Sequence, residues 1–183
     1  MENTYTATVN NVTDTAAAQN AVAPGSTINF VAVTYTTAAI GNPPPTGGAT
    51  EVAGGVDLVA ASGDVSGTFD SCQFYNVRRS GDFDLKVRLQ DLTAVTLWTK
   101  AGLMARASLS TNSPYAAAFS TPGMGGSQFS WRGATNGTAN ASGFFPTAYP
   151  NTWLRLKRSG NLFTGYASAD GNIWTFLGSS TIS

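Results

Sequence analysis

The residue types that most often perform catalysis are scarce in this sequence. It contains no histidine, which excludes Ser-His-Asp triads, Cys-His nucleophile pairs and the usual zinc sites. Its two glutamates, Glu2 and Glu51, are far apart, whereas a glycosidase needs two carboxyl groups on either side of one bond. The single cysteine, Cys72, excludes an intrachain disulfide and is expected to be a small buried side chain in a strand. We therefore expect a protein that is not an enzyme.

The closest pair of carboxylates is Asp82 and Asp84, in the segment GDFD. Their spacing places both on one face of a strand, where the expected role is a solvated surface or a salt bridge to a neighbouring lysine or arginine. Loop aspartates could instead supply the oxygen ligands that Ca²⁺ prefers. The candidate Ca²⁺ ligands are Asp64, Asp70 and Asp82. No other cofactor is expected.

Aromatic side chains beside loops are the remaining candidates for a ligand site. A sugar ring can stack on an exposed tryptophan or tyrosine while an arginine binds its hydroxyl groups. The candidate ligand-binding residues are Trp98, Arg106, Trp131, Arg132 and Tyr149. The alternative is that Trp131 and Trp153 belong to the core and that the arginines stack on aromatic rings or bridge strands.

The elements that must position these residues are predicted to be β-strands. Apolar and polar residues alternate most clearly in DFDLKVRLQDL (82–92), as expected for an antiparallel strand with one wet face. Similar short runs recur at intervals of roughly eight to twelve residues. The predicted strands are 4–12, 27–37, 56–60, 71–77, 83–92, 100–108, 115–120, 128–132, 153–159, 162–168 and 174–178. With no helical periodicity, they predict an all-β, two-sheet antiparallel jelly-roll sandwich.

Two polar segments are predicted to be connections. In SADGNIW (168–174), Asp170 is expected to accept hydrogen bonds from turn amides while Trp174 covers the hairpin. The segment RGATNGTANASG (132–143) has the composition of a polar, glycine-rich loop.

The composition favours an extracellular or assembled protein. Charged residues are 11% of the chain, so threonine, serine, asparagine and glycine must cover much of the surface. The net charge is zero, and the basic residues are spread along the sequence, which gives no electrostatic footprint for nucleic acid or an anionic membrane. No apolar run approaches the ~20 residues that span a bilayer. The start MENTYTATVN lacks the features of a signal peptide, so we expect release without one, the alternative being that a signal was removed.

A proline- and glycine-rich stretch divides the chain. We predict an N-terminal strand segment over 1–40, a linker over 41–48 and a jelly-roll sandwich over 49–183. Two strands cannot bury both of their faces, so the N-terminal segment must pack on the main body or on a neighbour.

Three motifs resemble a concanavalin A-like (laminin-G-like) jelly-roll family of bacterial secreted and surface multidomain proteins. They are GDFDLKVRLQDL, WTKAGLMARASL and TWLRLKRSGNLFTGYASADGNIWTFLGSSTIS, and the resemblance covers about residues 54–183. The resemblance implies two antiparallel sheets packed face to face, no established catalytic residues, and a carbohydrate-binding or adhesive role.

The chain departs from that family at both ends. Family members usually continue for two further strands, whereas this sequence stops at Ser183 and carries two strand-like runs at its start. We expect the N-terminal strands to complete the sandwich, either in cis or by donation to a neighbouring subunit. The residues assigned to this assembly role are Thr27, Ile28, Phe30, Val31, Val33, Tyr35, Pro43, Pro44 and Pro45.

Taken together, the sequence predicts a non-enzymatic structural protein that associates with copies of itself on a particle or cell surface. Examples of such a role are a virion decoration, capsid-cement or tail protein, or a surface filament, with a capsid or surface scaffold as a further partner. The alternative is a carbohydrate-binding, lectin-like module with glycans as partners. The expected location is a virion or the extracellular surface, without nucleic-acid binding or membrane insertion.

Overall fold

The protein is built from β-strands. The computed structural model describes residues 2–10, 21–41, 47–60, 63–123 and 125–182, and no helix occurs among them, so none could span a membrane. The chain divides into two compact units, Met1–Thr36 and Thr37–Ser183. Each unit is described by itself below.

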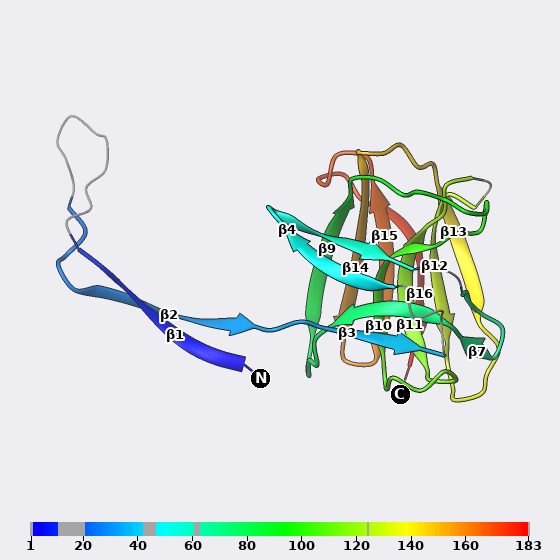
Figure 1. Cartoon of the computed structure of the whole chain (residues 1–183), viewed down its shortest axis with the longest axis horizontal. Helices are drawn as coiled ribbons and strands as arrows, with labels where there is room; N and C mark the ends of the chain where they lie inside the picture. The colour runs from blue at the N-terminus through cyan, green and yellow to red at the C-terminus, as the bar shows by residue number, and fades with distance from the viewer. Residues whose placement is uncertain (1, 11–20, 42–46, 61–62, 124, 183) are drawn as a thin grey trace. The chain divides into compact units, whose positions relative to one another are not determined.

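The larger unit contains two four-stranded antiparallel sheets packed face to face, which confirms the predicted β-sandwich (Figure 1). Sheet I has the order β10 (Ala101–Arg106), β11 (Tyr115–Ser120), β12 (Ser127–Arg132), β13 (Asn140–Phe145). Sheet II has the order β16 (Thr175–Thr181), β15 (Leu162–Ser168), β14 (Thr152–Ser159), β9 (Phe83–Leu89). Residues 140–143, the end of the predicted loop 132–143, belong to β13 instead.

The core between the sheets follows from alternation along the strands. On β14, Leu154 and Leu156 point inward and are fully buried, while Arg155 lies on the opposite face. Sheet I contributes small alanines and one large ring to the same core. The buried core residues are Ala116, Ala118, Phe129, Leu154, Leu156, Phe163, Ala167, Leu177 and Ile182.

Sheet I is buried on its second face as well. A separate cluster of Val65, Tyr115, Ala117 and Phe119 lies there, and every residue of β11 is buried. Four short strands cover this face or lie next to the cover. They are β3 (Thr36–Ile40), β6 (Val65–Ser66), β7 (Phe69–Asp70) and β8 (Cys72–Asn76). β3 pairs with β8, and β6 pairs with β7. Cys72 is half-buried and packs against this cluster.

The N-terminal unit is a single β-hairpin. β1 (Glu2–Val9) pairs antiparallel with β2 (Ser26–Val33), from Glu2 opposite Val33 to Val9 opposite Ser26, and the two strands form a sheet of their own. The predicted strand 27–37 is therefore two strands, β2 and β3, and the division between the units falls at β3 rather than after residue 40. A second hairpin, β4 (Gly48–Val52) and β5 (Gly55–Val59), belongs to the larger unit. Completion of the sandwich by the N-terminal strands, in cis or from a neighbour, stays a prediction.

Two facing glycines provide space for the largest ring of the core. Gly165 on β15 pairs with Gly178 on β16. A Cβ atom on Gly165 would lie 2.6 Å from Cδ2 of Phe129, and one on Gly178 would lie 3.1 Å from its Cδ1. The absence of side chains at this pair of positions lets the Phe129 ring lie against sheet II.

We expect Gly165→Ala to lower the free energy of unfolding by about 1–3 kcal/mol, because the added methyl overpacks the core against Phe129. Urea denaturation measures the change. The control is Gly133→Ala, where a Cβ meets no atom within 4 Å and the change should stay within about 0.5 kcal/mol. In a Phe129→Leu background the cost of Gly165→Ala should shrink; an unchanged cost would contradict the steric explanation.

Candidate functional site

The outer face of sheet II gathers cations and aromatic rings. Alternation places Lys86 and Arg88 of β9 and Arg155 and Lys157 of β14 on this face, away from the core. The register sets Lys86 opposite Arg155 and Arg88 opposite Trp153. We call this surface the cationic face; it consists of Asp84, Lys86, Arg88, Trp153, Arg155, Lys157, Tyr166, Trp174 and Phe176.

Arg155 is the centre of the cationic face. Its Nε donates to Oδ1 of Asp84 at 2.7 Å, and its Nη2 pairs with the other carboxylate oxygen, so the contact is bidentate. The guanidinium lies 5.4 Å from the ring centre of Tyr166 and 5.6 Å from that of Trp174. These contacts fix the side chain in one orientation on a solvent-facing sheet.

Further aromatic contacts extend from this centre. The Nζ of Lys86 lies 5.4 Å from the ring centre of Trp174, and the guanidinium of Arg88 lies 5.8 Å from that of Trp153. Tyr166 and Phe176 meet edge to face at 6.0 Å. Phe176 keeps 59% of its surface exposed, whereas Tyr166, Trp174 and Trp153 are half-buried.

The cationic face is positively charged. The hydrogen bond from Arg155 holds the pKa of Asp84 below its usual value, and the same contact raises the pKa of Arg155, so both stay charged at neutral pH. Among the strand residues of this face, four cationic side chains outnumber the single carboxylate of Asp84, so the face carries a net positive charge. The chain as a whole is neutral, so the charge is local.

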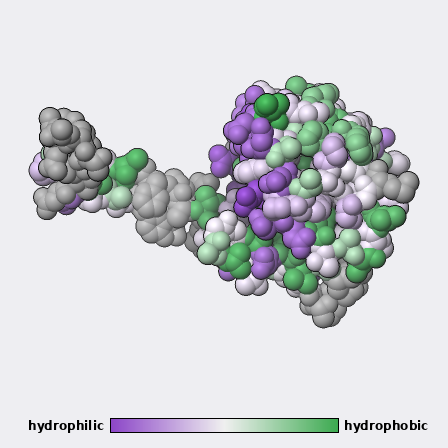
Figure 2. Space-filling view, turned by 90° about the horizontal axis from the view of Figure 1, so that it is seen from above, coloured by the Kyte–Doolittle hydropathy of each residue, from purple (hydrophilic) through white to green (hydrophobic). Residues whose placement is uncertain are grey.

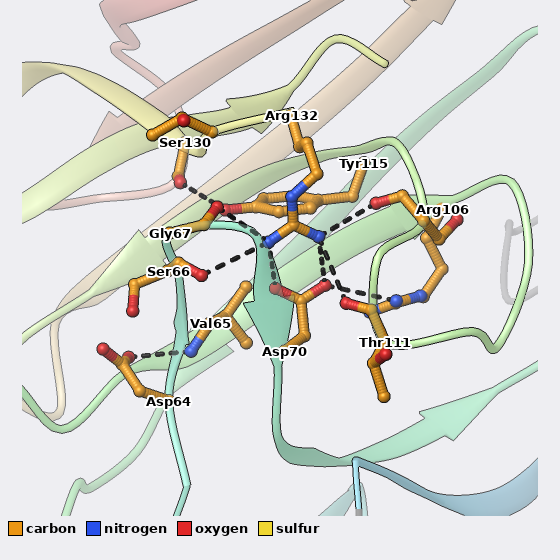
Figure 3. Close-up of polar contacts among 12 residues, drawn as sticks. Asp64, Val65, Ser66, Gly67, Asp70, Arg106, Thr111, Tyr115, Ser130 and Arg132 are labelled. Atoms are coloured by element: carbon orange, nitrogen blue, oxygen red, sulfur yellow. Dashed lines mark hydrogen bonds and ion pairs between the residues drawn. The ribbon is translucent and has the colours of Figure 1, made fainter. Parts of the chain in front are cut away.

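A second concentration of charge lies inside the molecule (Figure 3). Arg132 and Asp70 are fully buried and form a bidentate ion pair, with Nη1 2.7 Å from Oδ2 and Nη2 2.6 Å from Oδ1. Arg106 lies 3.2 Å from the same carboxylate. The Arg132 guanidinium also lies 5.1 Å from the ring centre of Tyr115. We call these four residues the buried ion cluster.

Backbone carbonyl oxygens accept hydrogen bonds from both arginines of the buried ion cluster. Arg132 donates to the carbonyl oxygens of Ser66, Gly67 and Ser113 at 3.1–3.3 Å, and Arg106 donates through Nε to Ser108 at 2.7 Å. The contact with Asp70 raises the pKa of Arg132, and burial raises the pKa of the Tyr115 phenol. The cluster therefore joins β6 and β7 to sheet I and leaves no surface for a ligand.

The structure corrects part of the predicted ligand site. Arg106 and Arg132 belong to the buried ion cluster, so the alternative of a structural role holds for both. Trp131 stacks on Phe129, with ring centres 5.4 Å apart, and packs against the core. The Tyr149 hydroxyl forms a hydrogen bond with the Ser120 hydroxyl at 2.7 Å, and burial raises its pKa. Only Trp98, with 60% of its surface exposed, presents a free ring.

The three predicted Ca²⁺ ligands are engaged elsewhere. Asp70 is in the buried ion cluster, Asp64 pairs with Lys100 and accepts from the Val65 amide, and Asp82 accepts from the Gly160 amide at 2.7 Å. Within the described ranges, no three His, Cys, Asp or Glu side chains come together in a way that could hold a metal ion. The predicted Ca²⁺ site is therefore not formed by these residues.

The residues assigned to assembly lie on or after β2. Thr27, Phe30, Val31 and Val33 are β2 residues, and Ile28, on the same strand, is 63% exposed. Tyr35 follows the strand and is exposed, whereas Pro43, Pro44 and Pro45 lie outside the described residues.

Exposed apolar residues also occur in the loops of the sandwich. Hydrophobic patches interrupt the hydrophilic surface in the view from above (Figure 2). The most exposed apolar residues of these loops are Val95, Leu97, Trp98 and Ile173. Of the four, only Trp98 was among the predicted ligand-binding residues.

Comparison with known proteins does not assign the chain to a group. No protein family, no curated protein and no solved structure matches it. The resemblance to concanavalin A-like domains therefore stays a prediction, and only the β-sandwich itself is established.

Asp70→Asn should lower the free energy of unfolding by about 3–5 kcal/mol, because two buried guanidinium groups would lose their counter-charge. Chemical denaturation monitored by tryptophan fluorescence measures the loss. Asp84→Asn is the matched control: it removes the same charge from a bidentate arginine pair on the surface and should cost less than about 1 kcal/mol. Equal losses for the two variants would show that burial of the cluster does not determine its contribution.

Proposed function

We propose that this protein is a non-enzymatic, lectin-like β-sandwich that binds a glycan on the cationic face of sheet II. The observation that carries the proposal is the row of solvent-facing aromatic rings, Tyr166, Trp174 and Phe176, set among arginine and lysine side chains. The expectation of a carbohydrate-binding role from the family resemblance supports the same function.

The chemistry of a sugar suits such a surface. The apolar C–H faces of a sugar ring stack on aromatic rings, which offer a large apolar area and a negatively charged face. The hydroxyl groups of the sugar can accept hydrogen bonds from lysine and arginine, which are donors only. Because Asp84 and two rings already hold Arg155 in place, binding would cost this side chain little conformational entropy.

A second candidate function is self-association through the N-terminal hairpin. Its specific support is that β1 and β2 form a two-stranded unit of their own, and an isolated two-stranded hairpin is at best marginally stable in water. Its outer strand edges could pair with another chain. Under this proposal the protein is a structural subunit that contacts copies of itself and a capsid or surface scaffold, on a virion or at the cell surface.

Trp174→Ala should weaken glycan binding by about tenfold, the size expected when a stacking ring and its cation contacts are lost. A glycan array first identifies a bound sugar, and titration calorimetry then compares the variants. The control is Trp98→Ala, which removes an exposed tryptophan that is not on the cationic face and should leave the affinity unchanged. Binding that is lost with Trp98→Ala and retained with Trp174→Ala would place the site in the loop instead.

Deletion of residues 1–36 should convert an oligomer to a monomer while the sandwich stays folded, because these residues form a separate compact unit. Size-exclusion chromatography with light scattering measures the mass, and thermal denaturation tests the fold. If the full chain is itself a monomer at high concentration, the proposal of self-association is wrong.

A further inference from the structure

We infer that the glycan bound by the cationic face is an acidic polysaccharide, one whose sugars carry carboxylate or sulfate groups. The inference rests on the proposed function, since it specifies the chemistry of the ligand of the same surface. Three properties of the face support the inference. In the described part of the chain, three of its cations lack a carboxylate partner, the cations are closely spaced, and Asp84 is already paired with Arg155.

Three of the four cations have no carboxylate partner. Among the described residues, none places an acidic group within salt-bridge distance of Lys86, Arg88 or Lys157. All three side chains are exposed. Lys86 and Arg88 are instead held over the rings of Trp174 and Trp153. Positive charge is thus positioned on the face and left without compensation.

The spacing of these cations suits a polymer with repeated negative charges. Lys86 and Arg88 are two residues apart on β9, and Arg155 and Lys157 are two apart on β14. Residues two apart on a strand lie about 7 Å from each other, and neighbouring strands lie about 4.8 Å apart. Because β9 and β14 are paired, the four cations form a compact group that several acidic groups of one chain could reach together.

The carboxylates on or next to the face are already engaged. Asp84 binds Arg155 through both of its oxygens, and its lowered pKa keeps this pair intact at neutral pH. It therefore repels an acidic ligand less than a free aspartate would. Asp82 and Asp170 likewise accept backbone hydrogen bonds, from Gly160 and from Asn172 and Ile173.

A neutral glycan would fit this surface less well. Covering Lys86, Arg88 and Lys157 with an uncharged ligand would remove part of their hydration without an opposite charge to replace it. Carboxylate or sulfate groups would provide charge-assisted hydrogen bonds at the same positions. Nucleic acid also carries repeated negative charges, so an oligonucleotide is the alternative ligand that the test must exclude.

The test compares a neutral polysaccharide with its sulfated form, which shares its backbone, and with a carboxylate-bearing polysaccharide of a different backbone. The full chain is titrated calorimetrically with dextran, dextran sulfate, polygalacturonate and a single-stranded DNA oligonucleotide. We expect binding to dextran sulfate or polygalacturonate, no binding to dextran, and affinity that falls with added NaCl because exposed charges are screened.

Charge variants locate the binding on the cationic face. The double variant Lys86→Glu/Lys157→Glu should weaken binding about tenfold or more, because two attractive surface contacts become repulsive. The matched control is Arg78→Glu/Arg79→Glu, which makes the same change at two exposed arginines in the connection before β9 and should leave the affinity unchanged. Asp84→Asn should strengthen binding, since it removes the negative charge that is paired with Arg155. Circular dichroism confirms that each variant is folded.

The outcomes separate the inference from the proposed function. If dextran and dextran sulfate bind equally, and only Trp174→Ala abolishes this binding, the inference of an acidic ligand is wrong and the proposed glycan site stands. If no glycan of either kind binds, both are wrong. An oligonucleotide that binds as tightly as the polysaccharides, or a control variant that weakens binding as much as the double variant does, would also overturn the inference.

Discussion

The buried ion pair between Asp70 and Arg132 is the interaction on which the arrangement of the larger unit depends. The centre of sheet I cannot face water on its second side, because β11 carries buried residues at every position. The covering segment that contains β6 and β7 has only four strand residues and a small apolar contribution of its own. The ion pair between this segment and β12 therefore provides the attachment that a larger hydrophobic interface would otherwise provide.

The cost of burying these charges explains the surrounding backbone. Two guanidinium groups and one carboxylate would be unfavourable in a dry interior without further acceptors. The turns at 66–67 and 108–113 direct their carbonyl oxygens at the two arginines, which completes their hydrogen bonds except at Nε of Arg132. The conformation of these loops is thus a consequence of the cluster that they enclose.

The core and the cationic face arise from the same alternating strands. On β14, every second residue fills the space between the sheets, and the residues between them form the outer surface. The small residues Gly165 and Gly178 bring sheet II close to Phe129 on one side, and Tyr166 lies on the other side of the same sheet. The positions of the outer aromatic rings are therefore set by the packing beneath them.

Much of the fold could be predicted from the sequence, but less of the site. Alternation in 82–92 correctly indicates the wet face of β9, 153–159 was predicted as a strand and is part of β14, and the turn at Asp170 is confirmed by its bonds to the Asn172 and Ile173 amides. The pairing of β9 with β14, more than sixty residues later, has no local signal, so basic residues that look scattered in the sequence come together on one sheet. Nor does local sequence distinguish a buried arginine from an exposed one. Arg132 and Arg155 both lie on strands beside aromatic residues, and only the distant Asp70 makes the first of them part of the interior.

The long sequence separation within the buried ion cluster has a consequence for how the chain folds. Asp70 and Arg132 are 62 positions apart, so the pair can form only after β12 has been placed in sheet I. Until then the covering strands have no charged partner, and the outer side of β11 stays open to solvent. Closing so large a loop is entropically costly, and folds rich in such distant pairings form slowly. We therefore expect the cover to attach only after β12 has joined sheet I.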